Sequence, residues 1–135
     1  MTFTQKEKQA LIDAASAARQ YAYVPYSKYR VGAAVQTKSG RVFTGANVEN
    51  AAYPQTMCAE RIAIFKAVSE GERDFAAIVV LTDNGGSPCG GCRQVMSEFG
   101  LDTIVLIANG EGQLMQEMTV KELLPEAFLP EKLAK

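Results

Sequence analysis

The sequence contains no histidine and only three cysteines, Cys58, Cys89 and Cys92. Without imidazole, a site for a soft metal ion such as zinc has to be built from cysteine thiolates. The number of cysteines is odd, and the chain opens without the apolar run of a signal peptide. Both observations argue against a disulfide framework, so we expect a cytoplasmic protein whose cysteines bind a metal ion or act in catalysis.

Long hydrophobic runs and patches of one charge are lacking as well. No apolar segment reaches the length of about 20 residues that a membrane-spanning helix needs. The 14 basic and 15 acidic residues are spread along the chain and give a formal net charge of −1. Nucleic acids and membrane surfaces attract proteins through clustered positive charge, so we expect neither as a partner.

The length and the order of the sequence patterns predict one α/β domain that spans residues 1–135. Taken in order, the predicted elements are a helix from a capping box at Thr4 and Glu7 to Pro25, strands at residues 31–37 and 41–47, a helix from Cys58 to about Glu70, a strand at 76–82, a helix from Cys89 to about Phe99, strands at 103–108 and 113–118, a short helix after Thr119, and an irregular tail. We expect a mixed sheet of about five strands with helices on its faces, in which strands 76–82 and 103–108 are parallel. The two cysteine-bearing helices would begin at the carboxyl end of this sheet, where such sheets bind ligands.

The cysteines are spaced for a single metal ion. Cys89 and Cys92 lie within one helical turn, and Cys58 lies at the start of another helix, where the backbone dipole favours a thiolate. Three protein ligands leave the fourth position of a tetrahedral Zn²⁺ ion open to water, as in catalytic sites. Glu60, two residues from a ligand, is placed to handle the protons of that water. We interpret this pattern as a catalytic site with one Zn²⁺ per chain.

Other interpretations of the cysteines remain open from the residues alone. Pro88-Cys89-Gly90-Gly91-Cys92 after a strand is also typical of a thioredoxin-like redox pair, although that interpretation leaves Cys58 without a role. A non-catalytic zinc module would use the same three ligands and close the fourth position with a carboxylate such as Glu60. Three inert core cysteines are the least specific interpretation.

Asn47 and Glu49 are predicted to project from the same face at the end of the second strand. Such a pair can lie in solvent at a sheet edge, and the residues alone favour that interpretation. The pair can also bind a sugar hydroxyl, one side chain as donor and the other as acceptor.

Cys58-Ala59-Glu60, followed about 30 residues later by Pro88-Cys89-Gly90-Gly91-Cys92, resembles the signature of zinc deaminases. Cys58 stands where many nucleic-acid deaminases have histidine. Further segments are similar to the small, homotetrameric cytidine deaminases, and together they cover nearly the whole chain: 22–29, 31–34, 45–53, 58–61, 87–94, 117–120 and 123–125.

This resemblance implies a three-layer cytidine-deaminase-like fold and the hydrolytic deamination of cytidine and 2′-deoxycytidine in pyrimidine salvage. In that family, residues matching Cys58, Cys89 and Cys92 bind the zinc ion, and the residue matching Glu60 transfers protons. A deaminase of another aminopyrimidine nucleoside, such as a blasticidin-type antibiotic, is a close alternative. The near-neutral charge disfavours a polynucleotide substrate.

The resemblance also implies how the nucleoside is held. Residues matching Asn47 and Glu49 bind the ribose 3′-hydroxyl, and the backbone around Ala59 holds the pyrimidine edge. An aromatic residue at the position of Tyr29 packs near the base and sugar. Family members commonly carry Phe there, so the hydroxyl group of Tyr29 is a departure. Phe128 matches a C-terminal aromatic residue that closes the pocket of a neighbouring subunit in the homotetramer, and Tyr53 could serve as a subunit contact or pocket wall.

Arg61 has a separate electrostatic interpretation. Three thiolates and Zn²⁺ sum to a charge of −1, which makes the metal a poorer acid toward its water. An arginine hydrogen-bonded to the sulfurs would draw charge off them and restore that acidity. The family has an arginine at this position. From the residues alone, an exposed helix arginine is an equal alternative for Arg61, and Arg93 could share the role.

Overall fold

The computed structural model describes residues 2–133, and within them five strands form one mixed sheet in the order β2-β1-β3-β4-β5. Strands β3 and β4 pair in parallel, and the other neighbours pair antiparallel. The strands are β1 (Gly32–Thr37), β2 (Val42–Ala46), β3 (Phe75–Leu81), β4 (Ile104–Ala108) and β5 (Leu114–Thr119). The mixed five-stranded sheet and the parallel β3–β4 pair confirm the sequence prediction.

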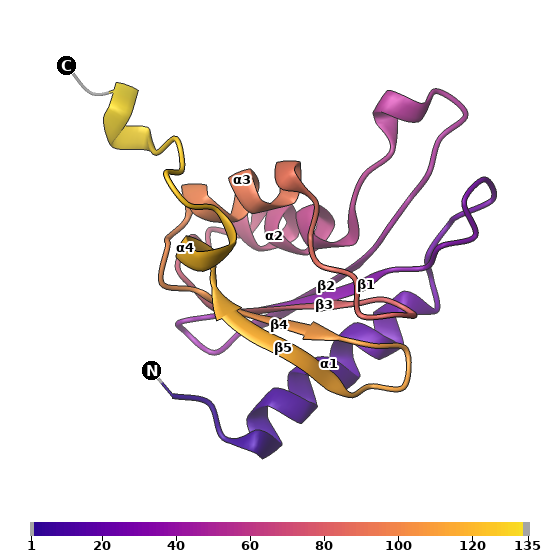
Figure 1. Ribbon diagram of the computed structural model, residues 1–135, viewed down its shortest axis with the longest axis horizontal. Coiled ribbons are helices and arrows are strands. Elements are labelled where there is room, and N and C mark those ends of the chain that lie inside the picture. The colour runs from indigo at the N-terminus through magenta and orange to yellow at the C-terminus, as the bar shows by residue number, and fades with distance from the viewer. Residues whose placement is uncertain (1, 134–135) are drawn as a thin grey trace.

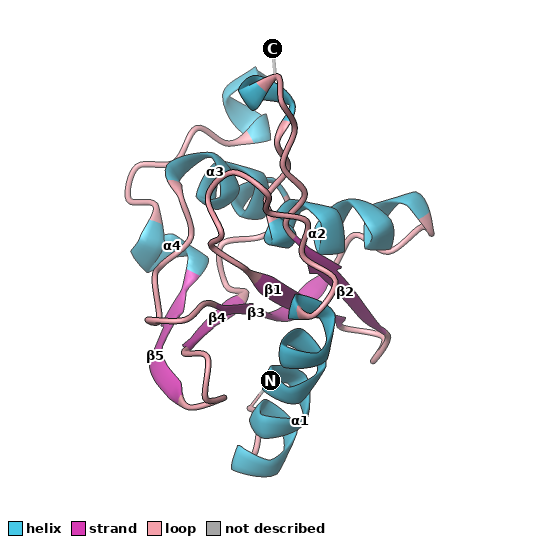
Figure 2. Cartoon of the chain, turned by 90° about the vertical axis from the view of Figure 1, so that its right-hand side faces the viewer, coloured by secondary structure: helices cyan, strands magenta, loops and turns pink. Residues whose placement is uncertain are grey.

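Helices cover both faces of the sheet and make the fold three-layered (Figure 1). The helices are α1 (Gln5–Arg19), α2 (Ala59–Ser69), α3 (Gly90–Glu98) and α4 (Val120–Leu123), with short 3-10 helices η1 (Tyr53–Gln55) and η2 (Pro130–Leu133). Helix α1 lies on one face, and α2, α3 and α4 lie on the other (Figure 2). The tail, predicted to be irregular, contains η2. Among residues 2–133, no helix combines the length and the apolar character needed to cross a membrane.

The hydrophobic core lies on both sides of β3 and β4. All seven residues of β3 are apolar and buried, as is typical of a strand at the centre of a sheet. Leu11 and Ile12 of α1 pack on one face, and Ile64 of α2 and Met96 of α3 pack on the other. The buried sheet thereby fixes the positions of the helices that begin at its edge.

Helices α2 and α3 begin at the same edge of the sheet. Strands β2 and β3 are both antiparallel to β1, and Gly32 at the start of β1 pairs with Ala46 and with Leu81, the last residues of β2 and β3. The carboxyl ends of β2 and β3 therefore lie together. The chain leaves this edge into the two loops that lead to Cys58 and Cys89.

The first helix is shorter than predicted. It was expected to reach Pro25, but α1 ends at Arg19. Beyond it, the Tyr23 N–H donates to the Asn47 carbonyl (2.9 Å), and the Glu49 N–H donates to the Tyr23 carbonyl (2.8 Å). A helical Tyr23 would use these groups within the helix, so long-range pairing overrides the local helical pattern.

Two glycines allow the helices to approach the hairpin closely. A Cβ atom at Gly32 would meet the Ala15 carbonyl oxygen of α1. A Cβ atom at Gly45 would lie 2.5 Å from the Ala59 carbonyl oxygen and 2.8 Å from the Ala63 nitrogen, both in the backbone of α2. Backbone atoms cannot move aside as a flexible side chain can, so glycine at residue 45 sets the height of α2 above the sheet.

We therefore expect Gly45→Ala to destabilise the fold by about 2–3 kcal/mol, the upper part of the usual range for overpacking. Thermal and chemical denaturation in saturating zinc measures the change. Gly90→Ala is the matched control, because a Cβ atom there meets nothing within 4 Å and should leave the free energy of unfolding unchanged or slightly raised. Equal stability of the two variants would contradict the packing argument.

Candidate active site

The three cysteines come together at the shared helix edge. Cys58 is the N-cap residue of α2 and Cys89 is the N-cap residue of α3, and neither side chain caps its helix. The three Sγ atoms all lie within 4.8 Å of one another, and those of Cys58 and Cys89 are 3.9 Å apart. Sulfurs bound to one tetrahedral zinc ion at about 2.3 Å are about 3.8 Å apart. The separation of Cys58 and Cys89 matches this value, so the donor set suits Zn²⁺.

The close approach of the thiols shifts the pKa values of Cys58 and Cys92 in opposite directions. A hydrogen bond with Cys92 lowers the pKa of Cys58 to about 6. The same contact, together with burial, raises the pKa of Cys92. The thiol of Cys92 thus favours the thiolate form of Cys58. A divalent cation in the same place would stabilise all the thiolates at once.

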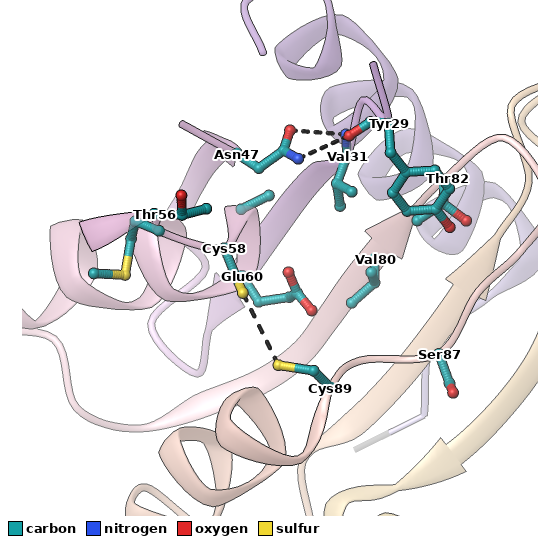
Figure 3. A pocket seen from close by; sticks show the side chains of 12 residues that line it. Tyr29, Val31, Asn47, Thr56, Cys58, Glu60, Val80, Thr82, Ser87 and Cys89 are labelled. Atoms are coloured by element: carbon teal, nitrogen blue, oxygen red, sulfur yellow. Dashed lines mark hydrogen bonds between the residues drawn. The ribbon is translucent and has the colours of Figure 1, made fainter. Parts of the chain in front are cut away.

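A pocket of about 230 Å³ opens onto one side of the cysteine group (Figure 3). Cys58 and Cys89 line it, whereas Cys92 is fully buried behind them. The carboxyl group of Glu60 projects into the same pocket from the first turn of α2. Within residues 2–133 the metal-ligating group has three members, and Glu60 is not one of them. The arrangement leaves a coordination position that faces the pocket.

Glu60 is almost fully buried, with 4% of its surface exposed. Burial raises the pKa of the Glu60 carboxyl above its usual range, because the charged form loses its hydration. A raised pKa brings a carboxyl group closer to the pH at which a general acid and base is most effective.

Arg61 lies against the cysteines rather than in solvent. Its Nη2 atom is 3.8 Å from the Cys89 sulfur, and its Nε atom is buried without a hydrogen-bond partner among the described residues. Arg93, which was considered for the same role, is engaged elsewhere. It donates to the Pro88 carbonyl (2.8 Å), to the Leu123 carbonyl (3.0 Å) and to the Ser87 hydroxyl (3.1 Å). Arg93 therefore fixes the loop before Cys89 instead of contacting the sulfurs.

Asn47 is buried and lines the pocket, so it is not part of a solvent-exposed pair. Its Oδ1 atom accepts from the Val31 N–H (3.0 Å), and its Nδ2 atom donates to the Tyr29 carbonyl (2.9 Å). Each of these atoms has a further hydrogen-bonding position. Asn47 thus shapes the pocket wall and still has capacity for a ligand.

Glu49 lies in an adjoining pocket that shares Thr56 with the first. Its carboxylate accepts hydrogen bonds from the backbone N–H groups of Tyr26 (3.0 Å) and Ser27 (3.1 Å). Hydrogen bonding from Ser27 lowers the pKa of Glu49, which keeps it an acceptor. The structure therefore places Asn47 and Glu49 in neighbouring hollows along one wall.

The other predicted site residues fall into two groups. Ala59 and Tyr29 line the pocket, and Ala59 is fully buried. Phe128 and Tyr53 do not line it in their own chain, and both are exposed, by 58% and 68%. The Phe128 carbonyl accepts a hydrogen bond from the Gln94 side chain (2.9 Å). Any contact of Phe128 with a pocket would have to be made with another chain.

Several pocket residues were not singled out from the sequence. Thr82 follows the buried run of β3, and Ser87 directly precedes Pro88 in the loop to Cys89. Polar residues at the carboxyl end of a central strand are a recognisable signal for a ligand site. The wall is completed by Val31, Thr56, Met57 and Val80, and nothing in their local sequence marks them as pocket residues.

The fold and the donor set together define a zinc-binding α/β protein whose metal faces a small-molecule pocket. The chain belongs to the family described as the cytidine and deoxycytidylate deaminase zinc-binding region, which matches residues 5–108. This assignment excludes the thioredoxin-like interpretation, and the geometry agrees with it because Cys58 joins the other two cysteines.

Relatives of known name agree with this assignment. The chain is 54% identical to a cytidine deaminase of Halalkalibacterium halodurans over 128 residues, which cover 93% of this chain and 96% of the relative. It is 37% identical to a blasticidin-S deaminase of Bacillus cereus over 73% of this chain and 76% of that one. The crystal structure of a cytidine deaminase from Burkholderia pseudomallei superimposes with a TM-score of 0.85 at 47% identity, and the match covers 93% of this chain and all of the other. The three-layer deaminase fold predicted from the sequence is confirmed.

We expect the purified protein to carry one zinc ion per chain. Zinc binding should weaken by more than about 100-fold in each of the variants Cys58→Ser, Cys89→Ser and Cys92→Ser. Substitution of residues that only support the ligands usually costs less than this. Native mass spectrometry gives the stoichiometry. Charge-transfer absorption of the Co²⁺-loaded protein reports how many thiolates bind.

Ser87→Ala is the control for this experiment, because Ser87 lines the pocket without being a member of the metal-ligating group. It should retain zinc. Stoichiometric zinc in a Cys89→Ser/Cys92→Ser double variant would show that the metal is held elsewhere.

Proposed function

We propose that this protein catalyses the hydrolytic deamination of cytidine and 2′-deoxycytidine to uridine and 2′-deoxyuridine with release of ammonia. The observation that supports this most directly is the buried carboxyl group of Glu60 at the open side of the cysteine group. Membership of the deaminase family and the small pocket agree with it. A pocket of about 230 Å³ is below the range of about 300–1,000 Å³ for drug-sized ligands, so it suits one heterocycle with part of a sugar.

In this proposal Glu60 moves every proton of the reaction. When bound by Cys58, Cys89 and Cys92, zinc supplies a Lewis acid that makes water a nucleophile near neutral pH. Glu60 accepts a proton from the attacking water and gives it to the ring nitrogen N3, which makes C4 electrophilic. The same carboxyl group then takes the second proton of that water, from the hydroxyl group added at C4, and gives it to the departing amino group, so that the C4 carbonyl forms as ammonia leaves. One water molecule is consumed, and no other co-reactant is needed.

The remaining pocket residues hold the nucleoside. Asn47 and Glu49 would bind the ribose 3′-hydroxyl with the hydrogen-bonding capacity that their internal contacts leave free. The backbone at Ala59 would hold the pyrimidine edge, and Tyr29 would pack near the base and sugar. Arg61, with its guanidinium group 3.8 Å from the Cys89 sulfur, would offset the excess negative charge of three thiolates.

Two alternatives remain. A blasticidin-type nucleoside would use the same chemistry with a different sugar substituent, and the Bacillus cereus relative makes it worth testing. A non-catalytic zinc module would need a side chain in the fourth metal position. Glu60 stands outside the ligand group in this structure, which favours the enzyme.

We further propose that the protein is a cytoplasmic homotetramer that serves pyrimidine salvage. Exposed aromatic residues support this assembly. Tyr26 and Tyr53 are exposed and stack edge to face, with ring centroids 5.7 Å apart. Phe128 is also exposed and lies close in sequence to η2, which stands away from the body of the chain (Figure 1). In a tetramer Phe128 would close the pocket of a neighbouring chain, and Tyr53 would lie at a subunit contact or in a pocket wall.

Cytidine mixed with the protein should lose its ultraviolet band in favour of that of uridine, and a chelator should abolish the change. Glu60→Gln should keep its zinc and lose at least about 10²–10⁴-fold in kcat, the usual contribution of one general acid and base. Glu70→Gln, at the exposed end of the same helix, is the control and should retain full activity. Blasticidin S is assayed in parallel. Near-normal turnover by zinc-loaded Glu60→Gln would remove Glu60 from the mechanism.

Sedimentation should give a mass four times the 14.6 kDa of the chain. Phe128→Ala should raise KM for cytidine roughly tenfold through loss of an aromatic contact. Mixing Phe128→Ala with Glu60→Gln chains should return part of the sites to the low KM, because the Glu60→Gln chain still donates Phe128 to a neighbouring site that has Glu60. A monomeric mass with full activity, or no gain on mixing, would contradict the shared pocket.

A further inference from the structure

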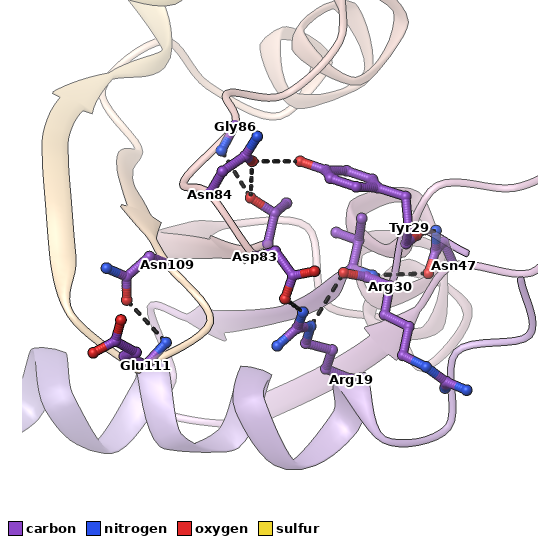
Figure 4. Close-up of polar contacts among 11 residues, drawn as sticks. Arg19, Tyr29, Arg30, Asn47, Asp83, Asn84, Gly86, Asn109 and Glu111 are labelled. Carbon is purple, nitrogen blue, oxygen red and sulfur yellow. Dashed lines mark hydrogen bonds and ion pairs between the residues drawn. The ribbon is translucent and has the colours of Figure 1, made fainter. Parts of the chain in front are cut away.

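The hydroxyl group of Tyr29 connects two segments of the pocket rim that are far apart in the sequence (Figure 4). It donates to the Oδ1 atom of Asn84 at 2.9 Å. Tyr29 precedes β1, whereas Asn84 lies in the loop of residues 82–89 that runs from β3 to Cys89. We propose that Tyr29 is a positioning residue, which through Asn84 holds this loop and its own ring in the shape that binds the nucleoside.

The acceptor Asn84 is itself held by the start of the same loop. The Thr82 hydroxyl donates to Asn84 Oδ1 (3.4 Å) and accepts from the Gly86 N–H (2.7 Å). The Gly86 amide thus donates to Thr82, and Thr82 donates to Asn84. The Oδ1 atom of Asn84 accepts hydrogen bonds from both Thr82 and Tyr29. A network in which each hydroxyl both accepts and donates fixes the orientation of all its members.

The loop leaves room for this contact only because residue 86 is glycine. A Cβ atom there would lie 2.8 Å from the Tyr29 hydroxyl oxygen. At the other end of the loop, Arg93 binds the Pro88 carbonyl and the Ser87 side chain. The loop is thus fixed on both sides of the bend that brings Ser87 and Cys89 to the pocket.

The backbone of Tyr29 is fixed independently of its side chain. The Tyr29 N–H donates to the Ser27 hydroxyl (3.0 Å), and the Tyr29 carbonyl accepts from the amide of Asn47 (2.9 Å). The ring, which is 38% exposed, would otherwise be free to rotate at the pocket mouth. The hydroxyl contact removes that freedom, so it should act on substrate binding and not on the proton transfers of Glu60.

The kinetic test rests on the proposed function. Tyr29→Phe keeps the ring and removes only the hydroxyl group, and we expect KM for cytidine to rise roughly three- to tenfold, the effect of one neutral hydrogen bond, with a much smaller change in kcat. Asn84→Ala should have the same effect, and the double variant should be no worse than either single variant. Asn84→Asp keeps an acceptor oxygen and should restore a low KM. Tyr21→Phe, which removes the hydroxyl of a tyrosine outside the pocket, is the control.

A second measurement does not depend on turnover. Hydrogen exchange of the Gly86 amide, followed in the zinc-loaded protein without substrate, should accelerate severalfold in Tyr29→Phe and remain unchanged in Tyr21→Phe. Wild-type KM and wild-type exchange in Tyr29→Phe, or additive effects in the double variant, would overturn the proposal. Absence of cytidine turnover by the wild-type protein would overturn the proposed function instead, and the exchange rates would then decide the role of Tyr29 alone.

Discussion

The N-termini of α2 and α3 lie together at one edge of the sheet, and the rest of the pocket depends on the positive electrostatic potential that they create there. Each N-terminus carries free N–H groups and the positive end of a helix dipole. Cys58 and Cys89 are the N-cap residues, and because their side chains do not cap, their sulfurs are free to bind a common ion. Cys92 occupies the buried side of that ion. The open side can then face only the pocket, which is where Glu60 projects.

The charge around the metal depends on a close contact between α2 and α3. Three thiolates and a divalent cation carry a net charge of −1, which the guanidinium group of Arg61 would offset in the proposed site. Arg61 reaches the sulfurs across Gly91, where a Cβ atom would collide with Nη2 of Arg61. The glycine inside the Cys-x-x-Cys motif therefore has a steric role toward the neighbouring helix. A bulkier residue at 91 would require Arg61 to adopt another position.

The sequence predicted the parts of the fold and site that local chemistry controls. The capping box at Thr4 formed as expected, a short helix followed Thr119 as predicted, and the two cysteine-bearing helices began at Cys58 and Cys89. The predicted end of α1 was wrong because the true end depends on backbone hydrogen bonds between Tyr23 and a segment about 25 residues later. Such pairing leaves no periodic signal in the helix itself. The structure likewise contradicted the solvent-exposed interpretation of Asn47, because its burial is set by the backbone of residues 29–31.

The hydrogen bond between Tyr29 and Asn84 is also a contact between residues far apart in the sequence. Its partners are 55 residues apart, and neither has a sequence neighbour that would indicate the other. Once the sheet brings the start of β1 beside the end of β3, the pocket wall at Tyr29 and Asn47 and the loop that leads to Cys89 become one connected unit. Asn47 holds the backbone of Tyr29, Tyr29 holds Asn84, and the loop of Asn84 leads to Cys89. A pocket whose walls are already connected loses little conformational freedom when a ligand binds, so more of the contact energy is available for orienting the nucleoside against Glu60.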